Sequence, residues 1–346
     1  MPSTAPLPLP PQSPKGRDMT ELPVIGITVG DPSGIGPEIV LAAAAHPEVR
    51  ARCTPLVIGS RANLDHTIAT LGLSVTLADE TDAAAPPDAI RVRDVPGVPA
   101  DLAFGVASAE GGRAAYAYIA EGVALARSGA IASLVTAPIN KVAMQLAGLG
   151  HTGHTEMLAE MTGAPWSLTL FTVADLRVLY LTRHLSLRDA IARIDQPLVV
   201  TTLERFMSVA PMIGLRAPKI AVQGLNPHCG EGGLFGTEDD EILAPAVAEA
   251  RRRGIDVHGP IPADSVFSQA RQGRWDVVLG LYHDMAAAIC KTLDFHGTVS
   301  TTLGLPFLRF SVDHGTAFDI AGKGIASPEN MVRTLLRAAE SAEANS

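Results

Sequence analysis

The sequence predicts an α/β protein in which strands and helices alternate along most of the chain. Short runs rich in Val, Leu and Ile have the length of buried strands, and stretches of helical length separate them. Gly (32 residues) and Pro (26 residues) are frequent and aromatic residues make up only 4%, a composition that suits many strand–turn–helix units. With 346 residues, 47% of them hydrophobic, the chain is too long for one ordinary core, so we expect two lobes.

Strands are expected where an apolar run is bounded by turn residues. By this criterion they are predicted at 24–30, 54–60, 74–79, 131–136, 167–173, 177–182, 219–225, 275–281 and 307–312. The runs 167–173 and 177–182 are separated by only a short gap, which indicates an antiparallel hairpin inside a mixed sheet. Residues 80–104 are rich in Pro, Ala and Asp, so we expect a loop or excursion there.

Helices are predicted between these strands. Pro37 and Glu38 open the first one, where a missing N–H costs nothing and a carboxylate suits the helix dipole. Further helices are expected at 61–73, 107–128, 186–194, 197–211, 238–253 and from about 328, with two more in 141–163 broken by GLGHTG. Residues 1–22 are proline-rich and lack the apolar core of a signal peptide, so we predict a disordered leader.

Composition and charge argue against several classes of partner. The net charge of −9 and a pI near 5.6 are unfavourable for binding nucleic acid or an anionic membrane surface. No run approaches the roughly 18 consecutive apolar residues of a membrane span. Cys53, Cys229 and Cys290 are too few and too scattered for a disulfide framework, which favours reduced thiols in a cytoplasmic protein.

Three histidines each follow an apolar run of strand length. His184 follows RVLYLTR, His228 follows KIAVQGLNP and His283 follows WDVVLGLY. Ligands of α/β sheets bind beyond the carboxyl ends of the strands, which is where all three imidazoles are expected. One histidine at a strand end is commonly a polar cap, but three in the same position predict a catalytic divalent metal site with one open coordination position.

Two glycine-rich segments indicate a binding site for a nucleotide cofactor. The run DHGTAFDIAGKGIASPEN (313–330) cannot form a strand or a regular helix, and its N–H groups can face phosphate or ribose oxygens. It resembles the nucleotide-binding loop of the β-decarboxylating dehydrogenases, isocitrate and isopropylmalate dehydrogenase, and GDPSGIGPE (30–38) resembles a turn near their start. The resemblance implies that NAD or NADP is bound by the loop residues Gly315, Thr316, Asp319 and Gly322.

A closer resemblance covers residues from about 24 to 340. TAPINK (136–141), GHTE (153–156), RHLSLRD (183–189), LNPHCGEGGLFGTED (225–239), GPIPAD (259–264), YHD (282–284) and TLGLPFLRFSVDHGTA (302–317) are similar, in this order, to the 4-hydroxythreonine-4-phosphate dehydrogenase family of pyridoxal phosphate biosynthesis. The resemblance implies a two-lobed isocitrate-dehydrogenase-like fold with the active site in the interdomain cleft. It also implies a homodimer whose partner subunit supplies one metal-binding histidine.

The family's functional residues fall on particular positions of this chain. Its metal ligands correspond to His184, His228 and His283, the same three selected by strand position. The remaining family positions contact substrate or lie near it: His154, Thr155, Lys291, Ser300, Arg309 and Asp264. Asp264 and Lys291 are both candidates for the proton acceptor. The resemblance thus assigns nucleotide binding to residues 23–140 plus 302–346, and metal, substrate and dimer contacts to residues 141–301. Zinc is the expected metal for three nitrogens, with magnesium, manganese or cobalt as alternatives.

The reaction implied is oxidation of 4-phosphooxy-L-threonine at C3, followed by decarboxylation to 3-amino-2-oxopropyl phosphate. Two departures keep an alternative open, because Ser300 and Met285 stand where the biosynthetic enzymes usually have Asn and Gln. Relatives oxidise 4-phospho-D-threonate or 4-phospho-D-erythronate, giving dihydroxyacetone phosphate, or act on aromatic dihydrodiols, which have no phosphate for GHTE and Lys291 to bind. A phosphate acyltransferase on a related scaffold is the alternative of another class, but it needs neither the loop 313–330 nor three imidazoles.

Overall fold

The computed structural model describes residues 22–150 and 153–344, and its strands form one 12-stranded sheet. The strands are β1 (Val24–Thr28), β2 (Thr54–Gly59), β3 (Leu77–Asp79), β4 (Ile90–Asp94), β5 (Ser133–Thr136), β6 (Leu168–Val173), β7 (Leu176–Tyr180), β8 (Ile220–Gln223), β9 (Val257–Ile261), β10 (Val277–Gly280), β11 (Val299–Leu303) and β12 (Arg309–Ser311). The predicted leader lies outside the described residues except for Leu22.

The sheet is mixed, as predicted. Its strand order is β3-β4-β2-β1-β5-β12-β11-β6-β7-β10-β8-β9. The strands from β3 to β12 in this order are parallel to one another, and so are β7, β10, β8 and β9. Between the two groups, β11 and β6 pair antiparallel with their neighbours, and β6 and β7 form the predicted hairpin. The α/β fold class is therefore confirmed.

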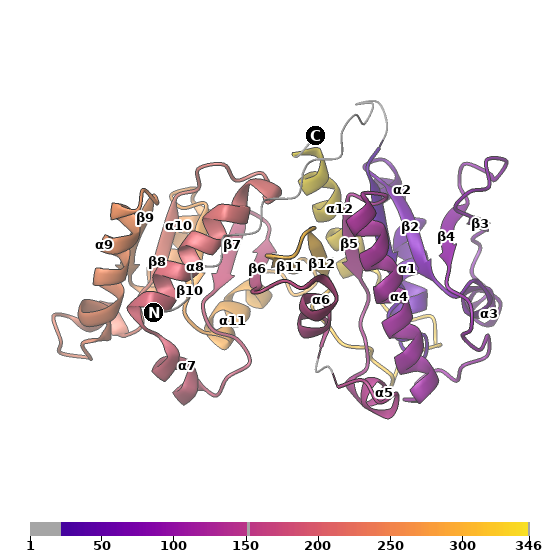
Figure 1. The fold of residues 1–346 in the computed structure, drawn as a ribbon, viewed down its shortest axis with the longest axis horizontal. Coiled ribbons are helices and arrows are strands. Elements are labelled where there is room, and N and C mark those ends of the chain that lie inside the picture. The colour runs from indigo at the N-terminus through magenta and orange to yellow at the C-terminus, as the bar shows by residue number, and fades with distance from the viewer. Residues whose placement is uncertain (1–21, 151–152, 345–346) are drawn as a thin grey trace.

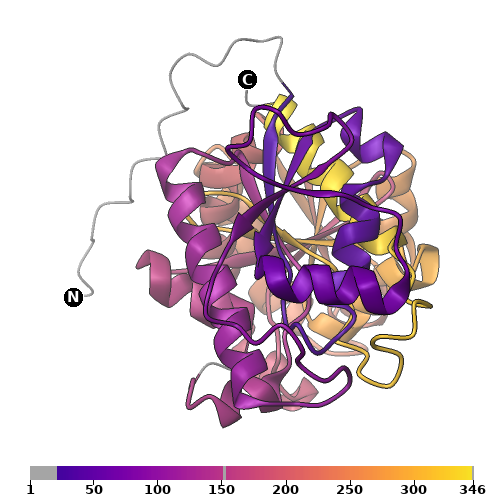
Figure 2. The ribbon, with the colours of Figure 1, turned by 90° about the vertical axis from the view of Figure 1, so that its right-hand side faces the viewer.

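Helices cover both faces of this sheet (Figures 1 and 2). They are α1 (Gly36–Ala44), α2 (Pro47–Arg50), α3 (Arg61–Leu71), α4 (Ala109–Ser128), α5 (Lys141–Leu146), α6 (His154–Thr162), α7 (Leu187–Arg193), α8 (Gln196–Val209), α9 (Ala244–Arg252), α10 (Ala263–Arg271), α11 (His283–Leu293) and α12 (Glu329–Glu343). Short helical turns lie at Ala210–Ile213, Pro227–Gly230 and Asp239–Leu243. None of the helices in the described ranges is both long and apolar enough to cross a membrane.

Several helices begin where a polar side chain caps the first turn. The Ser60 hydroxyl accepts a hydrogen bond from the Asn63 N–H, the Ser108 hydroxyl from the Gly111 N–H, and the Asn140 side chain from the Ala143 N–H. These caps satisfy N–H groups that have no partner inside the helix. They fix the residues at which α3, α4 and α5 begin.

The prediction that 80–104 is a loop or excursion was wrong in part, because β4 lies within it. Ile90 and Val92 are buried, while Arg91 and Arg93 alternate with them and remain partly exposed. Arg93 pairs with Glu80 at 2.5 Å and with Glu121 at 3.1 Å. This alternation is the pattern of a half-buried strand, and the Pro- and Asp-rich residues around it concealed the pattern. The strands β9 and β11 were likewise not predicted.

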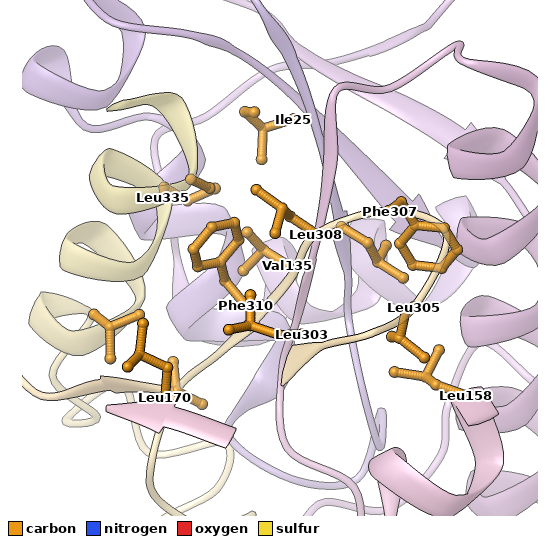
Figure 3. Close-up of a cluster of buried hydrophobic side chains, with 14 of the residues drawn as sticks. Ile25, Val135, Leu158, Leu170, Leu303, Leu305, Phe307, Leu308, Phe310 and Leu335 are labelled. Atoms are coloured by element: carbon orange, nitrogen blue, oxygen red, sulfur yellow. The ribbon is translucent and has the colours of Figure 1, made fainter. Parts of the chain in front are cut away.

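The centre of the sheet joins the two ends of the molecule. In Figure 1, β1–β5 with their helices lie at one end and β7–β10 with theirs at the other, while β12, β11 and β6 run between them. Buried side chains of β1, β6, β12 and α12 meet there, as Figure 3 shows for Ile25, Leu170, Phe310 and Leu335. The predicted lobe boundary at 301/302 falls inside β11, and the division of the chain into lobes stays a prediction.

The packing of this core should be measurable with a small deletion. We expect Ile25→Val to lower the free energy of unfolding by about 0.5–1.5 kcal/mol, because Ile25 is 0% exposed and the lost methylene leaves a void. The same change at Ile325, which is 66% exposed, is the matched control and should leave stability unchanged. Thermal and denaturant unfolding of both variants would check this, and equal effects at the two positions would contradict it.

Candidate active site

The strands that precede the predicted metal ligands end at one edge of the sheet. Because β7, β10 and β8 are parallel neighbours, their carboxyl ends point the same way, and His184, His283 and His228 follow those ends. Parallel β9 follows next in the sheet, and Asp264 comes after it in the first turn of α10. The strands before the three histidines therefore end at the same edge of the sheet, as the apolar runs indicated, and Asp264 also follows a strand that ends there.

His184 and His283 lie side by side at this edge. Their ring centroids are 5.8 Å apart, and the His283 ring also packs against Tyr180, with centroids 5.6 Å apart. Burial, followed by the charges of His283 and Arg183, lowers the pKa of His184 below its usual value. A lowered pKa keeps this imidazole neutral, which is the form that binds a metal.

Hydrogen bonds between the strand ends hold these two histidines in place. The Thr182 hydroxyl donates to the Leu281 carbonyl at 2.8 Å, and the Leu181 N–H donates to the Gly280 carbonyl at 2.9 Å. Arg183 donates to the Thr169 hydroxyl and to Ser167 of the preceding segment. The segments leading to His184 and His283 are thus fixed relative to each other.

His228 is presented by a separate, strained loop. His228 and Cys229 have φ values of 52° and 56°, and His184 also has a φ of 52°, a region that residues other than glycine rarely adopt. The buried Asp239 carboxylate holds the start of this loop by accepting the N–H groups of Leu225 (2.8 Å) and Asn226 (2.9 Å). The pKa of Cys229 is raised to about 11 by burial, which keeps its thiol protonated.

The donor set fits a divalent metal in part. Two neighbouring imidazoles, one of them kept neutral by burial, are suitable ligands. Within residues 22–150 and 153–344 of a single chain, however, no group of three or more His, Cys, Asp or Glu residues is close enough together to hold a metal ion. The predicted trio is therefore not assembled within one subunit, although two of its members lie together.

Arg309 and His154 lie close together at the centre of the molecule. Arg309, on β12, is 4% exposed, and its guanidinium donates to the hydroxyls of Thr136 (2.6 and 3.1 Å) and Thr302 (3.2 Å). Burial lowers the pKa of Arg309 to about 9. Burial and the Arg309 charge lower the pKa of His154, whose Nε2 atom is buried without a hydrogen-bond partner in the described structure. A buried cation whose partners in the described part of the chain are hydroxyl groups is suited to an anionic ligand.

The first turn of α6 adds backbone donors near this cation. His154 and Thr155 open the helix after Gly153, as predicted, and the N–H groups of a helix N-terminus favour phosphate. The preceding His151 and Thr152 lie outside the described residues. Glu156, one residue further on, acts electrostatically on both Arg183 and His184, so α6 lies near the histidine pair as well as near Arg309.

The other predicted substrate residues have different surroundings. The Lys291 ammonium forms an ion pair with Asp313 at 2.9 Å, without the geometry of a hydrogen bond, and lies 5.3 Å from the centre of the Phe295 ring. Ser300, on β11, is opposite Ser311 of β12. Asp264 is exposed. Sequence reasoning assigned no role to Asp313, Thr136 and Thr302, although each stands in a motif that carries the family resemblance.

The two glycine-rich segments pack against each other. The Ile35 N–H donates to the Thr316 carbonyl at 3.0 Å, and a Cβ atom at Gly34 would lie 3.0 Å from that oxygen. Glu38 is buried, which raises the pKa of its carboxyl, and the backbone of Gly324 and Gly322 opposes this effect. By contrast, a Cβ atom at Gly315 would meet nothing within 4 Å, and Asp319 is exposed.

Comparison with known proteins gives a consistent assignment. A family model described as "Pyridoxal phosphate biosynthetic protein PdxA" matches residues 51–338. The chain is 44% identical over 327 residues to D-threonate 4-phosphate dehydrogenase of Cupriavidus necator, covering 92% of this chain and 97% of that one. A crystal structure of 4-hydroxythreonine-4-phosphate dehydrogenase from Klebsiella pneumoniae superposes with a TM-score of 0.86 at 39% identity, covering 92% and 99% of the two chains.

A second structure of a 4-hydroxythreonine-4-phosphate dehydrogenase, from Burkholderia phymatum, has a TM-score of 0.83 at 43% identity and covers 93% and 99%. The fold and these relatives define an enzyme of the dehydrogenase class. Membership of this class implies NAD or NADP and a divalent metal as cofactors. The chain belongs to the PdxA family, as the motifs of the sequence indicated.

Proposed function

We propose that this enzyme catalyses the NAD- or NADP-dependent oxidative decarboxylation of a 4-phosphorylated 3-hydroxy acid. The observation that carries the proposal is the neighbouring His184 and His283 pair, 5.8 Å apart at the carboxyl edge of the strands. When bound, a divalent metal at these imidazoles would lower the pKa of the C3 hydroxyl and polarise the ketone that replaces it. Zinc suits the nitrogen donors, and magnesium, manganese or cobalt would serve the same chemistry.

The chain's own residues have distinct tasks in this proposal. Arg309 and the first turn of α6, with His154 and Thr155, bind the substrate phosphate. Gly315, Thr316, Asp319 and Gly322 hold the nucleotide against the turn 30–35. Hydride leaves C3 for the nicotinamide as the hydroxyl proton leaves for a base, Asp264 or Lys291. Carbon dioxide then departs from the β-keto acid.

Among the three substrates considered, we favour 4-phospho-D-threonate, which would give dihydroxyacetone phosphate. The hydroxyl of Ser300 and the thioether of Met285, where the biosynthetic enzymes carry amides, support a different C2 group. The name of the Cupriavidus necator relative points the same way. The second candidate is 4-phosphooxy-L-threonine, giving 3-amino-2-oxopropyl phosphate, because the structural relatives carry that name.

A substrate panel tests the assignment. NADH formation would be followed with 4-phospho-D-threonate, 4-phospho-D-erythronate and 4-phosphooxy-L-threonine, with NAD and NADP, before and after chelation of metal. We expect the highest kcat/KM with 4-phospho-D-threonate and no turnover after chelation. A preference for 4-phosphooxy-L-threonine would move the assignment to the biosynthetic reaction. Turnover of acyl phosphates without reduction of NAD would favour the acyltransferase alternative.

We further propose a homodimer with shared active sites, in which His228 of one subunit completes the pair on the other. Exposed apolar side chains flank the histidines, namely Leu185 and Leu187 after His184, and Leu234 and Phe235 after His228. Such exposed side chains beside a functional site are typical of a surface that another chain covers. The partner's contribution would account for the incomplete metal site in one chain.

Subunit mixing gives a sharp test of this arrangement. The variants His184→Ala and His228→Ala should each be inactive, but a mixture should regain about one quarter of wild-type activity, because random pairing makes half of the dimers mixed and each has one intact site. Co-refolding of equal amounts, with activity measured before and after, provides the measurement. Lack of recovery in dimers proven to be mixed would mean that all three histidines act within one subunit.

A further inference from the structure

A buried carboxylate lies beside the nucleotide loop and has no task in the reaction described above. Asp31, in the turn after β1, is only 1% exposed. Its Oδ1 atom accepts the Ser33 N–H at 2.9 Å, while Oδ2 is buried and has no hydrogen-bond partner in the described part of the chain. A buried carboxylate with so few partners is costly, and burial accordingly raises the pKa of Asp31 to about 6.

The carboxylate is in close contact with the first turn of α4. A Cβ atom built on Gly111 would lie 2.8 Å from Asp31 Oδ1, so only glycine fits this position without displacing the acid. Ser108 is the uncharged N-cap of α4. The N-terminus of a helix has a partial positive charge, which favours a nearby anion such as the Asp31 carboxylate. Asp31 thus joins the turn 30–35 to the start of α4.

The same turn is bonded to three other segments around the nucleotide loop. The Asp31 N–H donates to the Pro138 carbonyl at 2.9 Å, the Ile35 N–H to the Thr316 carbonyl at 3.0 Å, and the Gly105 N–H to the Ser33 carbonyl at 2.7 Å. Asn140, close to Pro138, donates to the Thr316 hydroxyl at 3.5 Å. Two routes therefore lead from Asp31 to the backbone and side chain of Thr316.

We propose that Asp31 is a positioning residue for the nucleotide site, holding the turn 30–35 so that this turn fixes the chain at Thr316. The inference rests on the proposed role of 313–330 in binding the cofactor. An asparagine would keep the Ser33 hydrogen bond and avoid the burial of a charge. The buried carboxylate therefore lowers the stability of the fold. Groups that do so at functional sites commonly serve the function, and here we expect Asp31 to strengthen cofactor binding.

The test is the variant Asp31→Asn, with NADH binding measured by fluorescence titration of the metal-loaded enzyme. We expect the NADH dissociation constant to rise about tenfold, because the neutral amide accepts the Ser33 N–H more weakly than the carboxylate and holds the turn 30–35 less firmly. Tm should stay the same or rise, because no charge is buried. The matched control is Asp82→Asn. Asp82 Oδ1 accepts the N–H of Ala84, two residues further on, at 2.9 Å, just as Asp31 accepts that of Ser33. Asp82, however, is exposed and lies outside the site.

The outcomes separate this inference from the proposed function. An unchanged NADH dissociation constant in Asp31→Asn, with wild type binding NADH, overturns the inference alone, whereas wild type that binds neither NADH nor NADPH overturns the proposed function. If Asp31→Asn does not fold, Gly111→Ala replaces it, because the added Cβ presses on Asp31 Oδ1 while favouring the helix. Unchanged NADH affinity in that variant would also overturn the inference.

Discussion

Replacing His184 with Ala is expected to remove the bound divalent metal and to lower kcat by about 1,000-fold or more. The metal is expected to supply several kcal/mol of charge stabilisation to the oxidation, and each 1.36 kcal/mol corresponds to a factor of about ten in rate. The ring centroids of His184 and His283 are 5.8 Å apart, and His184 has a φ of 52°, a backbone conformation that residues other than glycine rarely adopt. Metal content and the initial rate of NADH formation would be measured on the same preparation.

His258→Ala is the control for this change. His258 is on β9, where its ring contacts Asp256 at 2.8 Å and Arg251 at 3.0 Å, and it has no role in the proposed site. This variant should keep both metal and turnover. Full metal content and wild-type kcat in His184→Ala would refute the assignment of the histidine pair.

Arg309→Met is expected to lower kcat/KM for the phosphorylated substrate by about 30- to 5,000-fold. Truncating one partner of a buried charge pair costs about 2–5 kcal/mol, and the phosphate would lose its buried cation. The fold should survive, because methionine fills a similar volume and the buried charge is removed together with its desolvation cost. Kinetics with the phosphorylated substrate and its unphosphorylated analogue would separate a phosphate contact from a general defect.

The exposed Arg216 provides the matching control, since Arg216→Met removes the same charge outside the site. It should leave kcat/KM unchanged. If Arg309→Met affects the phosphorylated and unphosphorylated substrates equally, Arg309 supports the structure of the sheet and not phosphate recognition.

The part of the site that depends on strand ends could be predicted from the sequence. The apolar runs before His184, His228 and His283 are strands, and their parallel pairing brings these ends to one edge. The family resemblance added His154 and Arg309, which do lie close together. What a strand pattern cannot specify is the distance between loops. Only the family resemblance implied that one of the three histidines comes from the partner subunit, and among the described residues of one chain only His184 and His283 adjoin.

Contacts between distant segments were also beyond the sequence. The ion-pair partner of Lys291 is Asp313, and β11 and β12 separate the two residues in the sequence. The hydroxyl partners of Arg309 come from β5 and β11. These pairs are formed by tertiary packing, which leaves no periodic signal in either segment. β4 was missed for a different reason, because its alternation of two buried and two charged residues is too short to stand out among prolines and aspartates.

The uninterrupted sheet has a mechanical consequence for substrate access. Because β12, β11 and β6 are hydrogen-bonded to one another and to the strand groups on either side, rotation of one end of the molecule against the other must twist these strands elastically. A flexible linker would permit large rotations between the two ends, whereas continuous hydrogen-bonded strands permit only small elastic ones.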